Sequence, residues 1–512
     1  MLTNLKALVV VLAVAWAVFW LVRPLCLQYM SAEAFASRRN VWFALTIVAF
    51  VSPNFWIYAI FSIALLGWSG AKEENPLALY VLVTFAIPNA SFYIPTMLIG
   101  QLFDLTQYRI LSLAILLPWM VRLWNDPARA AHGRLRLADT ILIAFLLLQM
   151  VLTMPYESGT TTMRRAFLLT IDVFVVFYAF SRLVRLDRTT EVMACFWLAC
   201  AVMAPLAIFE WGKGWLLYTG LSALWGDPNV FSWLLRGGSL RSQVSAGHSI
   251  NLGYQLAVGL GFFLYLRSRS RSAAMAWLVT GTFAVAIYTT GSRGAWLTAA
   301  LAAVFFVLFR PGAVRRLAGA VALGAVIVAV MYVTPFKESV LDRLPLIGTV
   351  DQDTVDYRQQ LAEVSWTIIR QNPFFGNPFA ATQMESLRQG QGIIDIVNGY
   401  VFTALFNGFV GLFLVVAVWL VALGRGSVAM LRARAVDSDA GQAGAALVAV
   451  FLASLFYIAT AGYGTTTYII AGLLVSYATA MSWPSVAPAQ SRPVHAPGLA
   501  QQRGTVAAAR RS

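Results

Sequence analysis

A single arginine interrupts a long apolar stretch of the chain. Between residues 273 and 309, Arg293 is the only charged residue, in the segment Y-T-T-G-S-R-G-A-W-L-T. A guanidinium group near a bilayer costs on the order of 3 kcal/mol, so it normally faces a cavity or an anion. Ser292 and Gly294 flank it; glycine permits close backbone approach, and the following helix would offer free N–H groups to an anion. The segment predicts an anion-binding site, with an interfacial anchor as the alternative.

Two further apolar stretches are preceded by polar side chains suited to related chemistry. Arg241 and His248 lie just ahead of a stretch that begins near Leu252. An arginine can bind phosphate through two parallel hydrogen bonds, and a histidine can move a proton near neutral pH. Asp395 and Asn398 stand in the same way before the stretch that begins at residue 399. Taken singly, the histidine, the aspartate and the asparagine are also ordinary helix-capping residues.

The segment from residue 356 to 369 has the pattern of an amphipathic helix. Its charged side chains, Asp356, Arg358 and Glu363, are interleaved with an apolar set: Leu361, Val364, Trp366, Ile368 and Ile369. Such charges usually form a solvated helix face. We interpret them as part of a site because this segment, Arg293, Arg241 and Asp395 all fall on one side of the predicted membrane, as the loop charges indicate.

The composition predicts an all-α, polytopic membrane protein. Of the 512 residues, 59% are hydrophobic and only 12% are charged, whereas soluble proteins carry roughly 25% charge. Long uncharged windows in lipid require helices, and we predict a bundle of about 11–14. The three cysteines, Cys26, Cys195 and Cys200, lie in or beside apolar segments without metal-ligand spacing, so we interpret them as packing residues. The candidate spans are 6–22, 41–69, 77–100, 108–124, 138–154, 166–180, 191–212, 252–266, 273–289, 294–309, 314–333, 399–423, 444–461 and 464–482. The segment S-P-N at 52–54 breaks 41–69, and P-N at 88–89 breaks 77–100, so each of the two fits one kinked span, a hairpin or a re-entrant piece.

Arginines collect in alternate short loops, which the positive-inside rule places in the cytoplasm. The net charge of +15 then reflects membrane topology, and a nucleic-acid partner is not expected. Arg23, Arg38 and Arg39 fit this pattern poorly if Lys6 is cytoplasmic. We divide the chain into an N-terminal transmembrane bundle (1–212), a catalytic region (213–483) with a large external loop (335–398), and a disordered cytoplasmic tail (484–512).

The order of these segments resembles the O-antigen ligase/polymerase superfamily of bacterial membrane glycosyltransferases. The resemblance covers residues 236 to 425, about a third of the chain, and rests on the succession of motifs more than on any one of them. The matching residues are Arg241 with His248, Gly253 and Tyr254; the T-G-S-R-G-A-W segment at 290–296; Tyr357, Arg358, Trp366, Asn372, Pro373 and Gly376; and Asn398, Tyr400 and the N-G-F-V-G-L segment at 407–412.

The resemblance implies a GT-C-like transferase in the bacterial inner membrane that takes a polyprenyl-diphosphate-linked oligosaccharide as its donor, without a cofactor or metal. It implies that arginines bind the diphosphate, for which we choose Arg241, Arg293 and Arg358. His248 or Asp395 would act as base or orienter in an inverting transfer. The expected supporting residues are Ser292, Gly294, Asn398 and Tyr400. Candidate partners are a flippase and a chain-length regulator.

One departure bears on the acceptor. Ligases of this superfamily typically carry a histidine directly before the asparagine that ends the loop, where this chain has Val397. We therefore favour a polymerase that makes exopolysaccharide or O-antigen over a ligase that transfers polysaccharide to lipid A core. A transporter or flippase is a third alternative, because Asp172 lies within an apolar segment and could bind a proton or cation. It could equally pair with an arginine across the bundle.

Overall fold

The computed structural model describes residues 2–96, 100–125, 133–183, 185–226, 234–236, 238–270, 272–310, 312–316, 318–319, 352–388 and 394–482. Most of the candidate span 314–333, part of the loop 335–398 and the tail 484–512 lie outside the described residues. Within these ranges, eight helices are long and apolar enough to cross a membrane, and two shorter apolar ones accompany them. The predicted all-α membrane fold is confirmed.

The first half of the chain forms helices that are repeatedly interrupted. Two π-helical turns, η1 and η3, continue directly into the α-helices beside them. The elements are α1 (Leu2–Cys26), α2 (Ala32–Val51), α3 (Phe55–Lys72), α4 (Pro76–Val83), β1 (Ser91–Thr96), β2 (Gly100–Thr106), α5 (Gln107–Leu111), η1 (Ser112–Leu116), α6 (Leu117–Asn125), α8 (Leu137–Thr153), η2 (Met154–Tyr156), α9 (Gly159–Leu169), η3 (Thr170–Phe174), α10 (Val175–Phe180) and α11 (Leu186–Lys213).

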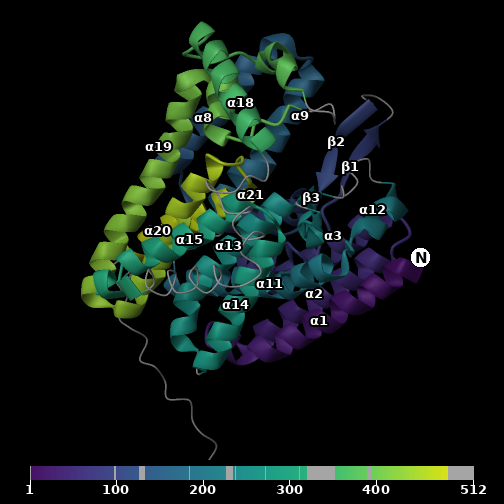
Figure 1. Cartoon of the computed structure of the whole chain (residues 1–512), viewed down its shortest axis with the longest axis vertical. Helices are drawn as coiled ribbons and strands as arrows, with labels where there is room; N and C mark the ends of the chain where they lie inside the picture. The colour runs from purple at the N-terminus through teal and green to yellow at the C-terminus, as the bar shows by residue number, and fades with distance from the viewer. Residues whose placement is uncertain are drawn as a thin grey trace, which may run out of the picture.

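The second half contains longer uninterrupted helices and the short elements of the external segments. In chain order they are α12 (Thr219–Trp225), β3 (Leu235–Arg236), β4 (Ser239–Leu240), η4 (Val244–Ala246), α13 (Ser249–Leu266), η5 (Arg267–Arg269), α14 (Ala273–Thr289), α15 (Arg293–Leu308), α18 (Gln352–Gln371), η6 (Ala380–Leu387), α19 (Gly399–Val436), α20 (Ser438–Ile458) and α21 (Thr465–Ser482). Figure 1 shows α19 and α20 along one edge of the molecule, α1 and α2 along another, and α11 and α13 between them.

Two of the candidate spans are not single helices. The stretch 41–69 is a pair of packed helices, α2 and α3, and the side chain of Asn54 caps α3 by accepting the backbone N–H of Ile57 at 3.0 Å. Of the alternatives for 41–69, the hairpin is therefore the observed one. The stretch 77–100 is not a continuous helix: α4 ends at Val83, and a two-stranded antiparallel ribbon, β1–β2, begins at Ser91.

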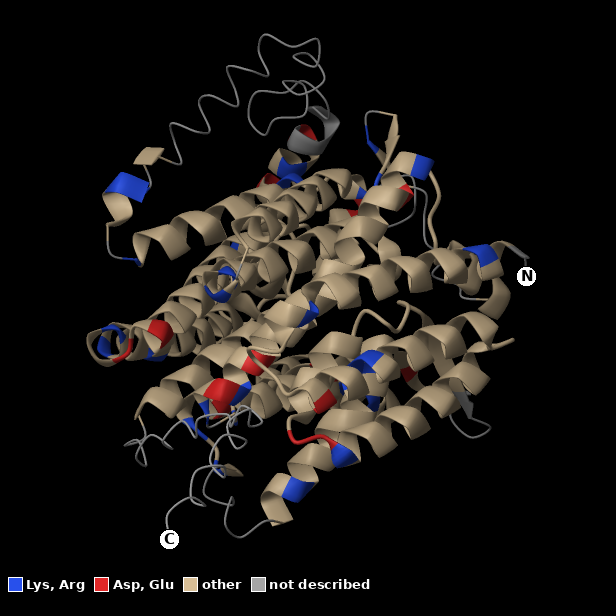
Figure 2. Ribbon diagram, turned by 90° about the horizontal axis from the view of Figure 1, so that it is seen from below, with Lys and Arg blue, Asp and Glu red and all other residues tan. Residues whose placement is uncertain are grey.

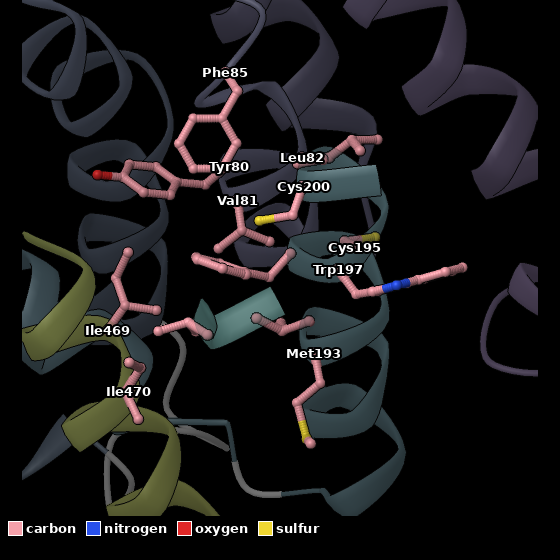
Figure 3. Packing of buried hydrophobic residues seen from close by; sticks show 14 of the residues in the cluster. Tyr80, Val81, Leu82, Phe85, Met193, Cys195, Trp197, Cys200, Ile469 and Ile470 are labelled. Carbon is pink, nitrogen blue, oxygen red and sulfur yellow. The ribbon is translucent and has the colours of Figure 1, made fainter. Parts of the chain in front are cut away.

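Helix α11 is the centre of the main core. It packs against α1, α4, α13 and α14 and is buried along most of its length. Figure 3 shows Tyr80 and Phe85 from α4 and the turn after it beside Cys200 and Trp197 of α11. All three cysteines are free and buried, which confirms that they are packing residues. The core thus fixes α11 as the frame against which the later helices are placed.

The first helix enters the bundle from the end opposite to the arginine-rich loops. Arg38 lies at the arginine-rich end, where it pairs with Glu73 and Glu191, each at 2.9 Å; the arginine side chain is 1% exposed. At the other end, the Asn4 side chain donates to the carbonyl of Gly220 at 3.1 Å. Arg23, Arg38 and Arg39 therefore obey the positive-inside pattern, because Lys6 is not on their side. Figure 2 shows long uncharged stretches of helix, with lysine and arginine at several helix ends.

A second, smaller core lies at the end opposite to the arginine-rich loops. It joins the apolar face of α18 to η6 and to the start of α19, and contains Leu361, Ile368, Ile369, Ala380, Met384, Leu387, Ala404 and Leu405. Asp356, Arg358 and Glu363 are exposed, as an amphipathic helix requires.

Two motifs of the sequence meet beside this core. Gly376, at the end of N-P-F-F-G, and Gly408, in N-G-F-V-G-L, both have left-handed φ angles, +70° and +63°. The backbone N–H of Phe409 donates to the carbonyl of Pro373 at 2.7 Å, and that of Asn377 to the carbonyl of Leu405 at 2.7 Å. A Cβ on Gly376 would come within 2.6 Å of the backbone of α19. These contacts hold the segment 373–377 in a break of α19, so both positions require glycine.

Candidate functional site

The turn that carries Arg293 is a tight connection between α14 and α15. Gly291 adopts a left-handed φ of +60°, and the buried Ser292 precedes the first residue of α15, which is Arg293 itself. The backbone N–H of Ser292 donates to the Thr290 hydroxyl at 3.3 Å. On the far side of the turn, a Cβ on Gly294 would come within 2.8 Å of the Thr460 hydroxyl. The glycines therefore allow this turn to be packed closely on both sides.

A second segment, residues 234–247, lies across that turn. The Arg241 side chain donates from Nε to the carbonyl of Thr290 at 2.9 Å, and the backbone N–H of Ser242 donates to the carbonyl of Thr289 at 3.1 Å. Arg236, the last residue of strand β3 in the short ribbon β3–β4, donates to the carbonyl of Gly291. The predicted pair Arg241 and Arg293 is thus brought to one place, and a third arginine joins it.

These arginines line an open pocket with a row of aromatic rings. The pocket holds about 430 Å³ of space, open solvent included, and its charged lining residues are Arg236, Arg241 and Arg293. The other lining residues are Trp211, Ser239, Leu240, Tyr288, Thr289, Gly291 and Trp296. The rings of Tyr288 and Trp296 are stacked at 5.5 Å between centroids, and Trp211 meets Tyr288 edge-on at 6.3 Å. We refer to this site as the arginine pocket. Three guanidinium groups that line one pocket suit a polyanion.

The segment that carries Arg241 is hydrogen-bonded to Glu210, near the end of α11. This carboxylate is fully buried and accepts three backbone N–H groups: Leu217 on Oε1, and Gln243 and Val244 on Oε2, each at 2.9 Å. Val244 adopts a left-handed φ of 47°, which is unfavourable for a β-branched residue. Charge-assisted hydrogen bonds of this kind are about twice as strong as neutral ones. Glu210 therefore fixes the backbone between Arg241 and His248.

His248 begins α13. Its Nδ1 accepts the backbone N–H of Ile250 at 3.2 Å, so in the neutral ring the proton lies on Nε2. Burial and, to a smaller extent, the nearby Arg241 guanidinium lower the pKa of His248 below its ordinary 6.5. At neutral pH the side chain is therefore an uncharged helix cap whose Nε2–H can donate a hydrogen bond.

Asp395 and Arg358 form a second group beside α18. The Tyr357 hydroxyl donates to the carbonyl of Asp395 at 3.1 Å and accepts the backbone N–H of the same residue at 3.0 Å. Desolvation raises the pKa of the Asp395 carboxyl above its usual 3.8, and the neighbouring Arg358 opposes the shift. A raised pKa moves a carboxylate toward the range that a general base needs.

The head of α19 follows directly. The Asn398 side chain accepts the backbone N–H groups of Tyr400 and Val401 at 3.0 and 3.1 Å, and the Tyr400 hydroxyl donates to the carbonyl of Leu455 at 2.9 Å. Asn398 is thus a helix cap, and Tyr400 ties α19 to the end of α20.

The connection between α20 and α21 bridges the two groups. Thr460 lies against Gly294 beside the arginine pocket, and Tyr463 shares a hydrogen bond of 2.7 Å with Thr403 of α19. Just before it, the ring of Tyr457 stacks on Tyr254 of α13 at 4.0 Å. The structure therefore links Arg293 to the head of α19 through this connection. Arg358 and Asp395 are not among the lining residues of the arginine pocket and form a separate group at α18.

One continuous region of the sequence contains the motif of Arg293, the two glycines Gly376 and Gly408, and the head of α19. Residues 274–416 match the O-antigen ligase family. The match confirms the predicted relationship to the O-antigen ligase/polymerase superfamily and a membrane function of that kind. It includes Arg293, Arg358 and Asp395, whereas Glu210, Arg236, Arg241 and His248 precede it. No curated protein matches the chain.

Sequence reasoning missed several residues of the site. Arg236 lies five positions before Arg241 across two glycines, so the spacing of the two arginines was an available signal. Glu210 is an isolated carboxylate in a candidate span, and such residues are expected to be functional. Trp211, Tyr288 and Trp296 carried no specific signal, because aromatic residues are common at every membrane interface.

Proposed function

We propose that the chain is a membrane glycosyltransferase that polymerises polyprenyl-diphosphate-linked oligosaccharide repeat units on the periplasmic face of a bacterial inner membrane. The product would be an exopolysaccharide or an O-antigen. The observation that carries the proposal is the meeting of Arg236, Arg241 and Arg293 in one pocket, at a turn within the O-antigen ligase match. The pocket would hold the diphosphate, because paired guanidinium groups fit phosphate oxygens and match their charge.

In the proposed reaction, the acceptor hydroxyl oxygen attacks the anomeric carbon of the donor sugar. The bond from that carbon to the diphosphate oxygen breaks, and the diphosphate leaves with the bonding electrons. Attack from the face opposite the leaving group inverts the anomeric configuration. The arginines stabilise the charge that develops on the diphosphate, and no metal is required for that role.

The hydroxyl proton needs an acceptor. Asp395 is our candidate base, because its pKa is raised and its backbone is fixed by Tyr357. His248 has its Nδ1 engaged by Ile250, so we assign it to donate from Nε2 and to orient a sugar hydroxyl or a phosphate oxygen. Arg358, beside Asp395, would guide the acceptor or contact the diphosphate. Ser292, Gly294, Asn398 and Tyr400 support these groups by shaping the two helix heads.

Specific residues bear on two alternative functions, a ligase and a transporter. A ligase that transfers polysaccharide to lipid A core remains the alternative within the superfamily, and Val397 in place of the ligase histidine favours the polymerase. A transporter is disfavoured because Asp172 is engaged: Arg109 donates to both of its carboxylate oxygens, at 2.7–3.1 Å. A flippase and a chain-length regulator are the proposed partners, since one delivers the donor and the other would limit the product.

The test is a donor-binding and elongation assay with purified protein and a lipid-linked repeat unit. Arg293→Lys keeps the charge but loses the fork, so donor affinity should fall about 10- to 150-fold, the value of one charged hydrogen bond. Arg39→Lys, at a half-buried position on the other side of the membrane, should leave donor binding and elongation unchanged. Donor binding within a few-fold of wild type would make Arg293 an interfacial anchor. Chain growth only when a lipid A core acceptor is added would favour the ligase.

A further inference from the structure

A second basic site lies at the arginine-rich end of the bundle, away from the arginine pocket. The groove runs between the start of α8, the last turns of α19 and the end of α21, and holds about 1220 Å³ of space, open solvent included. Its charged lining residues are Arg136, Arg425 and Arg432. The other lining residues are Gly424, Val428, Ala429, Ala478, Thr479, Met481 and Ser482. We call it the basic groove.

Arg136 is held in place at the back of the basic groove. Its guanidinium donates to the carbonyl of Ser181 at 2.8 Å and to the hydroxyl of Thr479 at 2.9 Å. Burial, together with the nearby guanidinium groups of Arg182 and Arg425, lowers the pKa of Arg136 to about 10. A positive charge so disfavoured by its surroundings is stabilised by an anion at the open side of the groove.

The neighbouring carboxylates are engaged elsewhere. Asp139 pairs with Arg182 at 2.6 Å in a fully buried contact, Asp437 caps α20, and Asp439 pairs with Arg269 at 2.5 Å. The sequence beyond the end of α21, residues 483–512, contains four arginines and no aspartate or glutamate. Side-chain carboxylates of that tail therefore cannot neutralise the basic groove.

The rim of the groove is apolar. Leu137, Val428 and Leu431 are 55%, 47% and 58% exposed, on helices that the composition places in lipid. Arg425 and Arg432 are exposed on α19, the helix that also carries Val428 and Leu431. Gly424 leaves the wall open, because a Cβ at this position would meet no atom within 4 Å. The groove thus offers cations at headgroup level and an apolar surface next to them.

We propose that the basic groove binds the phosphate headgroup of an anionic phospholipid from the cytoplasmic leaflet. Arg425 and Arg432 contact the phosphate oxygens from α19, Arg136 faces them from α8, and an acyl chain lies along the exposed leucine and valine side chains. Clusters of arginine between helices at the cytoplasmic surface suit such headgroups, since charge and lipid contact coincide there. This site is independent of the glycosyl transfer proposed for the arginine pocket.

The experiment measures lipid binding to the purified full-length protein by native mass spectrometry and by thermal unfolding. The probes are phosphatidylglycerol, phosphatidylcholine and inorganic phosphate. Phosphatidylglycerol should bind wild type and raise its Tm, and the double variant Arg425→Gln/Arg432→Gln should bind it about 30-fold more weakly, at about 1 kcal/mol for each arginine. The matched double variant Arg23→Gln/Arg39→Gln removes the same charge from an exposed and a half-buried position on the same side and should bind as wild type does.

Three outcomes overturn the proposal. Equal weakening in both double variants would show a diffuse effect of net charge, and no weakening in either would place the lipid elsewhere. Stabilisation by inorganic phosphate as large as that by phosphatidylglycerol would mean that the groove takes the free ion, without a lipid. None of the substituted arginines is buried, so both double variants should fold, and an unchanged Tm without lipid checks this.

Discussion

Replacement of Glu210 should release the segment that carries Arg241. In Glu210→Gln, one oxygen of the former carboxylate becomes an NH2 group. An amide oxygen in the Oε2 position can still accept Gln243 and Val244, but the NH2 group then faces the Leu217 N–H and the third bond is lost. Leaving one buried donor unsatisfied costs about 1–3 kcal/mol.

Glu210→Ala removes all three acceptors at once. The summed cost would be about 3–9 kcal/mol if the backbone stayed in place, which is comparable to the stability of a whole domain. The chain avoids most of that cost by opening locally, so residues 242–244 should detach and become hydrated while the helices persist. Arg241 then loses its fixed position over Thr290, and donor affinity should fall with it.

Hydrogen exchange of the amides of Leu217, Gln243 and Val244 measures this directly. In Glu210→Gln the protection of the Leu217 amide should fall roughly 5- to 150-fold, as about 1–3 kcal/mol implies, and in Glu210→Ala the protection of Gln243 and Val244 should be lost as well. Glu33→Gln, at an exposed carboxylate in the first turn of α2, is the matched control. Unchanged protection and unchanged donor affinity in a folded Glu210→Ala protein would refute the reasoning, because something else would then hold the segment.

Three further outcomes are expected. Gly376→Ala, which puts a Cβ 2.6 Å from the backbone of α19, should make α18 sensitive to protease, whereas Gly281→Ala, with no atom within 4 Å, should not. Wild-type activity should fall as the pH drops below 6.5, since protonation removes the Nδ1 acceptor of His248; His248→Asn, which caps without titrating, should lack this acid limb. Arg38→Ala should lower stability by about 3–5 kcal/mol by stranding two buried carboxylates, and Arg39→Ala by less than about 0.5 kcal/mol, both measured by thermal unfolding.

Apolar runs and their breaks predicted the helices well where local helix capping and proline determine where a helix ends. The S-P-N break indicated an interruption but left a kinked span, a hairpin and a re-entrant piece open. The hairpin is observed, because proline interrupts the first helix and the Asn54 side chain caps the second. The same logic failed at 77–100, since the strand β1 contains Phe92, Tyr93 and Ile94 and is as apolar as a span. A two-stranded ribbon depends on pairing with its partner strand β2, which begins four residues after β1 ends, and the apolar content of the segment carries no signal of that pairing.

The candidate site shows a similar division. Arg293 was predictable because a charge in an apolar stretch needs a partner or a cavity, and Arg241 because an arginine just ahead of such a stretch can bind phosphate. That Arg236 joins them, and that Glu210 holds the backbone beneath Arg241, depends on hydrogen bonds between segments that are distant in sequence. The place of His248 in the chain was predictable, but the tautomer that makes it a donor follows only from its contact with Ile250.

The latch between residues 373–377 and the break in α19 is made by main-chain atoms. Its hydrogen bonds run from Phe409 to Pro373 and from Asn377 to Leu405, so they do not depend on side-chain rotamers. α18 and the first part of α19, up to its break at Gly408, are therefore joined as one rigid unit. Any tilt of α19 would carry α18, and with it Tyr357 and Asp395, toward or away from the turn of Arg293, which is mounted on a different helix. The distance between the two halves of the site would then follow the angle of one helix. In the proposed polymerase, that angle would set how tightly the growing chain is held.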